Sequence, residues 1–263
     1  MEDQMLLDGK VALVSGAGAG LGRAAGRRLA AHGARVVFSD LDEAAVTASV
    51  RAVHEDGGEA HGVVADITDR DACDRAISDA LSTFGRLDAL VNDAYDGGDY
   101  QRFADADLAS WRRTADVNVF GTLTMTQAAL VALRASGSGR IVMVCTHGVE
   151  VIQPSFGAYT GSKAALAHHT KLLAAELGGD GIRVNAVYPG PIWGRNLQGF
   201  LDAQAGAANV EPEVVYAAFR AKNAMNEFVT ADAVADCIVF LASDLSRTLT
   251  GQALYANAGE SFH

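Results

Sequence analysis

The stretch GKVALVSGAGAGLG, residues 9–22, decides the fold of this chain. Residues 10–16 form a short, β-branched apolar run closed by Gly16, which is typical of a buried strand. The glycines after it lead into LGRAAGRRLAAHG, residues 21–33, whose apolar spacing and final glycine predict a helix. The stretch therefore predicts a strand, a tight glycine turn and a helix in direct succession.

The same alternation continues along the chain. Further strands are predicted at 34–40, 60–66, 87–93, 139–145, 182–190 and 251–259, and further helices at 42–58, 69–85, 107–136, 158–179 and 231–243. The strands are almost continuously apolar, which is typical of a parallel sheet covered on both faces. The sequence therefore predicts an α/β, doubly wound parallel sheet of seven strands with helices on both faces.

We expect residues 1–263 to form a single domain, because no Pro- or Ser-rich linker or repeat divides them. One segment departs from the alternation of strands and helices. Residues 191–229 follow a predicted strand and far exceed the usual connection of ~4–6 residues. A long insertion at the carboxyl end of a strand is a candidate lid or substrate loop.

Composition excludes several classes of function. The net charge of −11 argues against nucleic acid and anionic membranes as partners and favours solubility. The acidic start MEDQMLLDGK does not resemble a signal peptide, and no apolar run approaches the ~20 residues of a membrane span. The three cysteines and seven histidines show no metal-ligand spacing. We expect a cytoplasmic protein without a metal.

The glycine-rich turn predicts a phosphate-binding site. Gly16 permits a sharp turn, and the next glycines let the backbone approach a diphosphate at the N-terminus of the helix. Asp40 ends the second predicted strand, where an acidic residue can accept hydrogen bonds from a ribose. The alternative is a tight strand-to-helix turn that binds nothing.

A second candidate site is CTHGVEVIQPSFGAYTGSK, residues 145–163. Tyr159 and Lys163 are four residues apart in a predicted helix and therefore share one face. A free tyrosine has a pKa near ~10, and a neighbouring ammonium is expected to lower it so that the phenol can exchange a proton. The alternative is an ordinary pair on a helix surface.

Together these motifs resemble the short-chain dehydrogenase/reductase family, classical type. The spacing of Gly16 and Gly20 and the sequence YTGSK carry the resemblance, with AD (65–66), VNDA (91–94), VNVFG (117–121) and YPGPI (188–192) in the order of the family. The resemblance covers nearly the whole chain. It implies a Rossmann fold, and an NAD-dependent oxidoreductase that interconverts a small-molecule substrate between a secondary alcohol and a ketone.

The resemblance also implies roles for particular residues. Tyr159 would be the acid/base, Lys163 would bind the nicotinamide ribose, Thr146 would donate to the substrate oxygen, and Asn118 would hold a water in a proton relay. The implied contacts to NAD are Gly16, Ala19, Gly20, Leu21, Asp40, Leu41, Asp66, Ile67, Asn92, Ala94, Tyr159, Lys163, Pro189, Gly190 and Ile192. Asp40 favours NAD over NADP, because a 2′-phosphate would meet its like charge.

The chain departs from the family pattern at several positions. Thr146 stands in place of serine, and Gly194 in place of a threonine that contacts the nicotinamide carboxamide. Asp93 and Tyr95 replace the second asparagine and the glycine of the Asn-Asn-Ala-Gly turn. Tyr95 is therefore expected to point to the mouth of the pocket.

Four residues are candidates for substrate contact, namely Tyr95, His147, Trp193 and Phe200. If Trp193 and Phe200 line the pocket, the substrate is hydrophobic or cyclic; the alternative is that these rings pack the lid on itself. Two other functions stay open: a non-catalytic nucleotide-binding sensor or scaffold, and an epimerase or dehydratase with tightly held NAD. The resemblance also implies a homotetramer that pairs the predicted helices 107–134 and 157–178.

Overall fold

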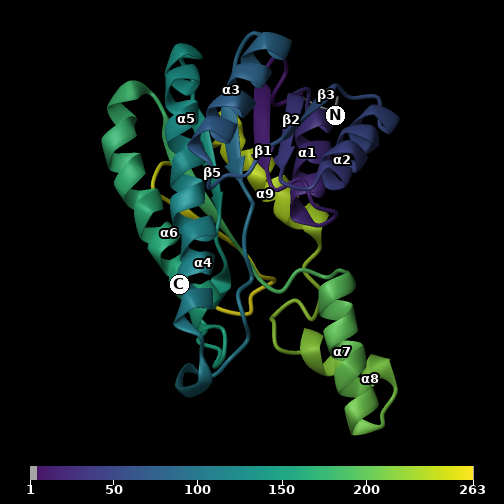
Figure 1. The fold of residues 1–263 in the computed structure, drawn as a ribbon. Coiled ribbons are helices and arrows are strands. Elements are labelled where there is room, and N and C mark those ends of the chain that lie inside the picture. The colour runs from purple at the N-terminus through teal and green to yellow at the C-terminus, as the bar shows by residue number, and fades with distance from the viewer. Residues whose placement is uncertain (1–4, 263) are drawn as a thin grey trace.

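A computed structural model describes residues 5–262 of the chain. Seven strands form one parallel sheet in the order β3-β2-β1-β4-β5-β6-β7 (Figure 1). Their bounds are β1 (Val11–Ser15), β2 (Arg35–Asp40), β3 (Ala60–Val64), β4 (Ala89–Asn92), β5 (Arg140–Val144), β6 (Arg183–Pro189) and β7 (Ala253–Ala256). The prediction of a doubly wound parallel sheet with seven strands is confirmed.

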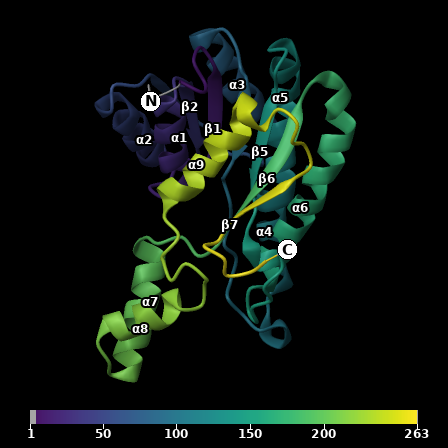
Figure 2. The same cartoon turned by 180° about the vertical axis from the view of Figure 1, so that it is seen from behind.

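Helices cover both faces of the sheet. They are α1 (Leu21–Ala31), α2 (Glu43–Glu55), α3 (Arg70–Phe84), α4 (Leu108–Ala115), α5 (Thr122–Ala135), α6 (Gly157–Leu177), α7 (Arg195–Ala208), α8 (Pro212–Arg220) and α9 (Ala231–Ala242). Helices α1, α2 and α9 pack on one face, and α3, α5 and α6 on the other (Figures 1 and 2). Helices α7 and α8 project away from both layers in the two views.

The apolar strands divide their side chains between two cores. Leu13, Val37 and Leu90 belong to the core beneath α3, α5 and α6. Val14 and Phe38 belong to the core beneath α1, α2 and α9. Successive side chains of a strand point to opposite faces, so a strand covered on both faces must be apolar at every position.

Gly26 brings α1 unusually close to the sheet. A Cβ atom on Gly26 would lie 2.1 Å from Cζ of Phe38, whose side chain is fully buried. A larger residue at position 26 would force α1 away from β2, so this contact fixes the position of the helix that follows the glycine turn.

The carboxyl ends of the strands meet along one edge of the sheet. Ser15 of β1 pairs in register with Ser39 of β2 and with Asn92 of β4. The strand order reverses between β1 and β4, and ligands of doubly wound sheets bind in the crevice at such a point. The residues after β1, β4 and β5 are therefore placed to form a common site.

The predicted helix 107–136 is interrupted. It consists of α4, a π-helical turn from Asp116 to Gly121, and α5. A π turn inserts an extra residue into a helix and is frequent at functional sites. Sequence periodicity does not show this turn, because one inserted residue shifts the apolar pattern only slightly.

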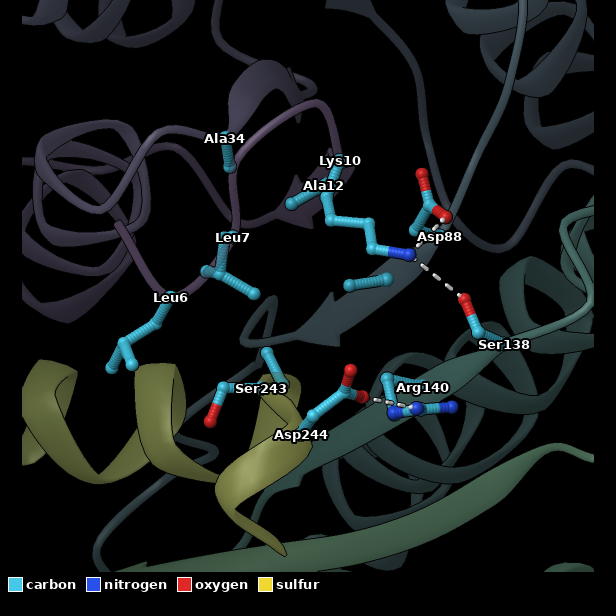
Figure 3. Close-up of a pocket in the computed structure, with 12 residues that line it drawn as sticks. Leu6, Leu7, Lys10, Ala12, Ala34, Asp88, Ser138, Arg140, Ser243 and Asp244 are labelled. Carbon is cyan, nitrogen blue, oxygen red and sulfur yellow. Dashed lines mark hydrogen bonds and ion pairs between the residues drawn. The ribbon is translucent and has the colours of Figure 1, made fainter. Parts of the chain in front are cut away.

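A small pocket lies at the opposite edge of the sheet, at the amino ends of β1, β4 and β5 (Figure 3). Its polar lining consists largely of ion pairs. Lys10 Nζ lies 3.5 Å from Asp88 and donates to Ser138 Oγ, and Arg140 pairs with Asp244 at 2.8 Å (Figure 3). These contacts join neighbouring strand ends and place the pocket away from the crevice.

Residues 5–262 contain neither a candidate membrane-spanning helix nor a candidate metal site. None of the helices in this range combines the length and the apolar character needed to cross a bilayer. The same residues contain no group of three or more His, Cys, Asp or Glu side chains arranged to hold a metal ion.

Candidate active site

Tyr159 and Lys163 lie on one face of α6, near its start. The helix begins at Gly157, where a Cβ atom would lie 2.6 Å from the ring of Trp111 on α4. Lys163 is buried, and its Nζ donates a hydrogen bond to the carbonyl of Val144 at 2.7 Å. The same Nζ lies 5.9 Å from the centre of the Tyr159 ring. The predicted pair is therefore present, with the ammonium turned towards β5.

In this arrangement burial, rather than Lys163, has the largest influence on the pKa of Tyr159. Burial raises the pKa of Tyr159 above its ordinary value, and Tyr95 raises it further. Burial also lowers the pKa of Lys163. The reason is geometric: the ammonium is bonded to the backbone of β5, so it does not offset the burial of the phenol.

Thr146 lies just beyond the end of β5, beside Tyr159. Its Oγ1 accepts a hydrogen bond from the N–H of Gly148 at 3.1 Å and so begins the 3-10 turn His147–Val149. The side chain of Thr146 lies close enough to the phenol of Tyr159 to act to lower its pKa. The two hydroxyl groups therefore face the same point at the edge of the sheet.

Asn118 sits in the π turn and is fully buried. Its Oδ1 accepts from the N–H of Asp96 at 2.7 Å, while its Nδ2 donates to the carbonyl of Asp96 and to Ser162 Oγ, both at 2.9 Å. Ser162 Oγ in turn donates to the carbonyl of Tyr159 at 2.7 Å. Both amide hydrogens of Asn118 are thus used, and its side chain ties the loop after β4 to the start of α6.

The glycine turn after β1 has the shape of a phosphate cradle. Gly16 has a φ of +93°, and a Cβ there would lie 2.5 Å from the nitrogen of Ala94. A Cβ on Gly18 or Gly20 would meet no atom of the described residues within 4 Å, so this side of the turn is open. Gly20 is the N-cap of α1 and has no side chain to occupy the free N–H groups of the first turn. The turn therefore fits a bound diphosphate.

Other predicted cofactor contacts also lie at this edge. Asp40 ends β2, and its Oδ1 accepts from the N–H of Asp42 at 3.0 Å. Leu41 beside it is 73% exposed. Asp66 follows β3 and bonds Thr68, and Ile67 is buried. Ala19 is exposed at the tip of the turn, and Leu21 is buried at the start of α1.

The predicted cofactor contacts at the ends of β4 and β6 are held by bonds within the protein. The side chain of Asn92 is buried and donates to Thr126 Oγ1 on α5 at 3.0 Å, so it points into the interior. Pro189 ends β6, the N–H of Gly190 bonds the carbonyl of Ala256 at 3.0 Å, and Ile192 forms an isolated bridge with Val229.

Tyr95 lies at the mouth of the site. Its ring meets the ring of Tyr159 edge to face at 5.9 Å, and Lys163 Nζ lies 5.8 Å from its centre. The side chain is 57% exposed. Tyr95 therefore lies beside Tyr159 with its ring partly open to solvent, and its contact with a substrate stays a prediction.

The other three candidates for substrate contact lie in different environments. Trp193 stacks on Phe228 with ring centres 4.0 Å apart and also contacts Tyr216, so it packs within segment 191–229. Phe200 on α7 is 59% exposed. His147 is buried, and its Nδ1 lies 3.7 Å from Glu260 in the C-terminal segment.

Sequence reasoning missed several partners of the site. Ser162 could have been found, because it lies within YTGSK and three residues after Tyr159 on the same helix. Asp96 and Glu260 carried no local signal, since their partners are far away in the sequence. Phe228, the centre of the aromatic cluster in segment 191–229, was likewise missed.

The comparisons with known proteins agree with this geometry. The family described as Enoyl-(Acyl carrier protein) reductase matches residues 16–261. A 2-(S)-hydroxypropyl-CoM dehydrogenase of Xanthobacter autotrophicus is 34% identical, over 96% of this chain and 97% of that protein. A cis-4-hydroxycyclohexanecarboxylate dehydrogenase of Sinomonas cyclohexanicum is also 34% identical, over 95% and 96% of the two chains.

A solved structure of an NAD+-bound xylitol dehydrogenase superposes with a TM-score of 0.87 at 28% identity, covering 95% of this chain and 98% of that one. The matching folds, the order of the motifs and the long alignments all lead to one assignment. The chain belongs to the short-chain dehydrogenase/reductase family, classical type, a family of oxidoreductase enzymes.

Proposed function

We propose that this protein is an NAD-dependent oxidoreductase that interconverts a secondary alcohol and a ketone. The observation that carries the proposal is the proximity of Tyr159 and Thr146 at the carboxyl edge of the sheet, where the Thr146 side chain acts to lower the pKa of the phenol. Lys163 lies beneath them, and the open glycine turn of α1 lies at the same edge. NAD would supply the hydride acceptor and donor.

The protein side of the reaction follows from these groups. Thr146 donates a hydrogen bond to the substrate oxygen, which stabilises the charge that develops there. Tyr159 moves the proton of that oxygen. Because burial raises the pKa of the free phenol, Tyr159 needs a nearby positive charge to act as a base. Lys163 supplies that charge if it leaves the carbonyl of Val144 and bonds a ribose.

The role in the proton relay that was expected for the Asn118 side chain is assigned instead to the main chain around this residue. Its amide hydrogens hold Asp96 and Ser162, so its side chain has no donor left for a water. The π turn changes the hydrogen bonding of the carbonyl groups around this residue. We assign the relay water to one of those carbonyl groups.

A hydrophobic or cyclic alcohol is the proposed substrate. The exposed ring of Tyr95 and the apolar lid border the site. The name of the Sinomonas relative, which acts on a hydroxylated cyclohexane ring, supports this choice.

We also propose a single domain, residues 1–263, with residues 191–229 as its lid, and assembly as a homotetramer. Large apolar side chains are exposed on the outer helices and in the loop before them; they are Phe103, Leu108, Phe120, Val131 and Leu172. A cytoplasmic location fits the three free cysteines, because thiols persist in reducing compartments.

The test is turnover of NADH with a panel of ketones, using the unmodified protein and Tyr159→Phe. The variant loses only one oxygen, so it should bind NADH with unchanged affinity and lose at least ~100-fold in kcat. A variant retaining more than a tenth of the activity refutes the assignment of Tyr159. Binding of NADH without turnover of any ketone favours a sensor, and purified protein carrying NAD that does not exchange favours an epimerase or dehydratase.

A further inference from the structure

Asp93 places a carboxyl group at the start of α1. The residue follows β4, and its N–H donates to the carbonyl of Ser15 at 2.9 Å. The backbone N–H of Gly22, in the first turn of α1, acts to lower the pKa of this carboxyl group. A Cβ atom on Gly22 would lie only 3.0 Å from Asp93 Oδ2. The carboxyl group therefore lies against the first turn of α1, next to the glycine turn that would hold the cofactor diphosphate.

Charged and titratable groups face Asp93 from several elements. Lys163 on α6 attracts its negative charge, whereas Asp40 at the end of β2 repels it. Tyr95 in the same loop and Tyr159 on α6 also interact with it. Burial is the largest influence and raises the pKa of Asp93 to about 7. Its surface is still partly accessible from the crevice, so the group can exchange protons with solvent.

A dinucleotide would make the ionised form of Asp93 less favourable. A diphosphate brings negative charge to the same helix end and competes for its positive field. It also covers the crevice and removes water from the carboxylate, which again favours the neutral form. We propose that Asp93 takes up one proton from solvent when the dinucleotide binds, so that cofactor binding and the charge of this carboxyl group are linked.

This proposal rests on the proposed function, which supplies the dinucleotide. The direction of the pH dependence follows from the linkage between proton binding and cofactor binding. A ligand that prefers the protonated carboxyl group binds with constant affinity well below pH ~7 and loses up to ~10-fold in affinity per pH unit above it. The free protein holds the carboxylate largely ionised at pH 8, and the complex holds it protonated.

The proton has a second consequence, at Tyr159. The negative charge of Asp93 raises the pKa of Tyr159. Protonation of Asp93 removes that charge and makes the phenolate of Tyr159 easier to form. Asp93 therefore does not contact the substrate. It acts on Tyr159 through its charge, which changes when the cofactor binds.

The experiment is calorimetric titration with NADH at pH 7.5 in phosphate and in Tris, whose ionisation enthalpies differ. All proteins carry Tyr159→Phe, so that the phenol contributes no proton. We expect a net uptake of between ~0.5 and ~1 proton per NADH bound, and a Kd that is ~10-fold or more weaker at pH 8.5 than at pH 6.5.

Two variants locate the proton. Asp93→Asn keeps the size of the side chain and an oxygen for Gly22, so it should bind NADH with neither the uptake nor the pH dependence. Asp99→Asn removes an exposed carboxylate from the same loop and should behave like the parent protein.

No net proton uptake by the parent protein, or the same uptake by Asp93→Asn, overturns the role of Asp93 and leaves the proposed function standing. If Asp93→Asn does not bind NADH, the number of protons taken up by the parent protein decides whether the role of Asp93 stands. Failure of the parent to bind NADH or NADPH at any pH refutes the dinucleotide site itself, and this proposal with it.

Discussion

Cofactor preference offers a direct test of the placement of Asp40. The carboxylate ends β2 at the edge of the crevice, where it is partly exposed and holds the N–H of Asp42. Residues 39–50 contain no lysine or arginine to neutralise a 2′-phosphate. Arg23 is close in sequence, but its Nε donates to Ser49 Oγ on α2 at 2.9 Å. We therefore expect NADH to be preferred over NADPH.

The size of the preference follows from Coulomb's law. Two unit charges ~4 Å apart repel by ~1 kcal/mol in bulk water and by ~4 kcal/mol near a protein surface. A partly exposed carboxylate lies between these limits. Since ~1.4 kcal/mol corresponds to a factor of ten, kcat/KM with NADH should exceed kcat/KM with NADPH by ~5-fold to ~1000-fold.

The double variant Asp40→Ala, Leu41→Arg should reverse this order. Leu41 is 73% exposed, so an arginine fits there without disturbing the core, and Tm should change little. The assay is kcat/KM for both cofactors with one ketone. Leu41→Ala, which changes the same surface without adding charge, is the control and should keep the parent ratio. Equal values for NADH and NADPH in the parent would show that Asp40 does not face the ribose.

Three further results are expected. Thr146→Ser should keep most activity, whereas Thr146→Ala should lose ~100-fold in kcat, because only the hydroxyl is required; an active alanine variant contradicts this role. Phe228→Ala removes the ring stacked on Trp193 and should raise the KM for the ketone. The Tm of the protein should fall by no more than a few degrees, which a melting curve checks. Val131→Arg should weaken assembly, because Val131 is 76% exposed on α5; a parent protein that sediments as a monomer at micromolar concentration refutes the tetramer.

The order of the strands and helices was predictable because each buried strand is a short apolar run between glycines or polar residues. The run 10–16, for example, became β1, and every residue of β1 is buried. The site could be anticipated where its members share one element, as Tyr159 and Lys163 do on α6. Spacing along a helix decides which side chains are neighbours, so local sequence is sufficient there.

The direction of Lys163 was not predictable in the same way. Its ammonium bonds the carbonyl of Val144, which belongs to another element, and periodicity carries no information on such a contact. The burial of Asp93 is a second example. A polar residue after a strand usually reaches water, but here α1 lies above it because Gly22 and Gly26 permit close packing. Distant glycines thus decide the environment of a local carboxyl group.

The segment 191–229 has an aromatic cluster of its own. Trp193, Tyr216, Phe219 and Phe228 contact one another, and α7 and α8 project from the layers of the main body (Figure 2). A unit that is held together by its own rings can accumulate substitutions on its exposed faces while the sheet remains unaffected. Under the proposed function, new substrate preferences arise during evolution by exchange of surface residues such as Phe200, while the proposed proton-transfer residues and the foldability of the sheet are inherited unchanged.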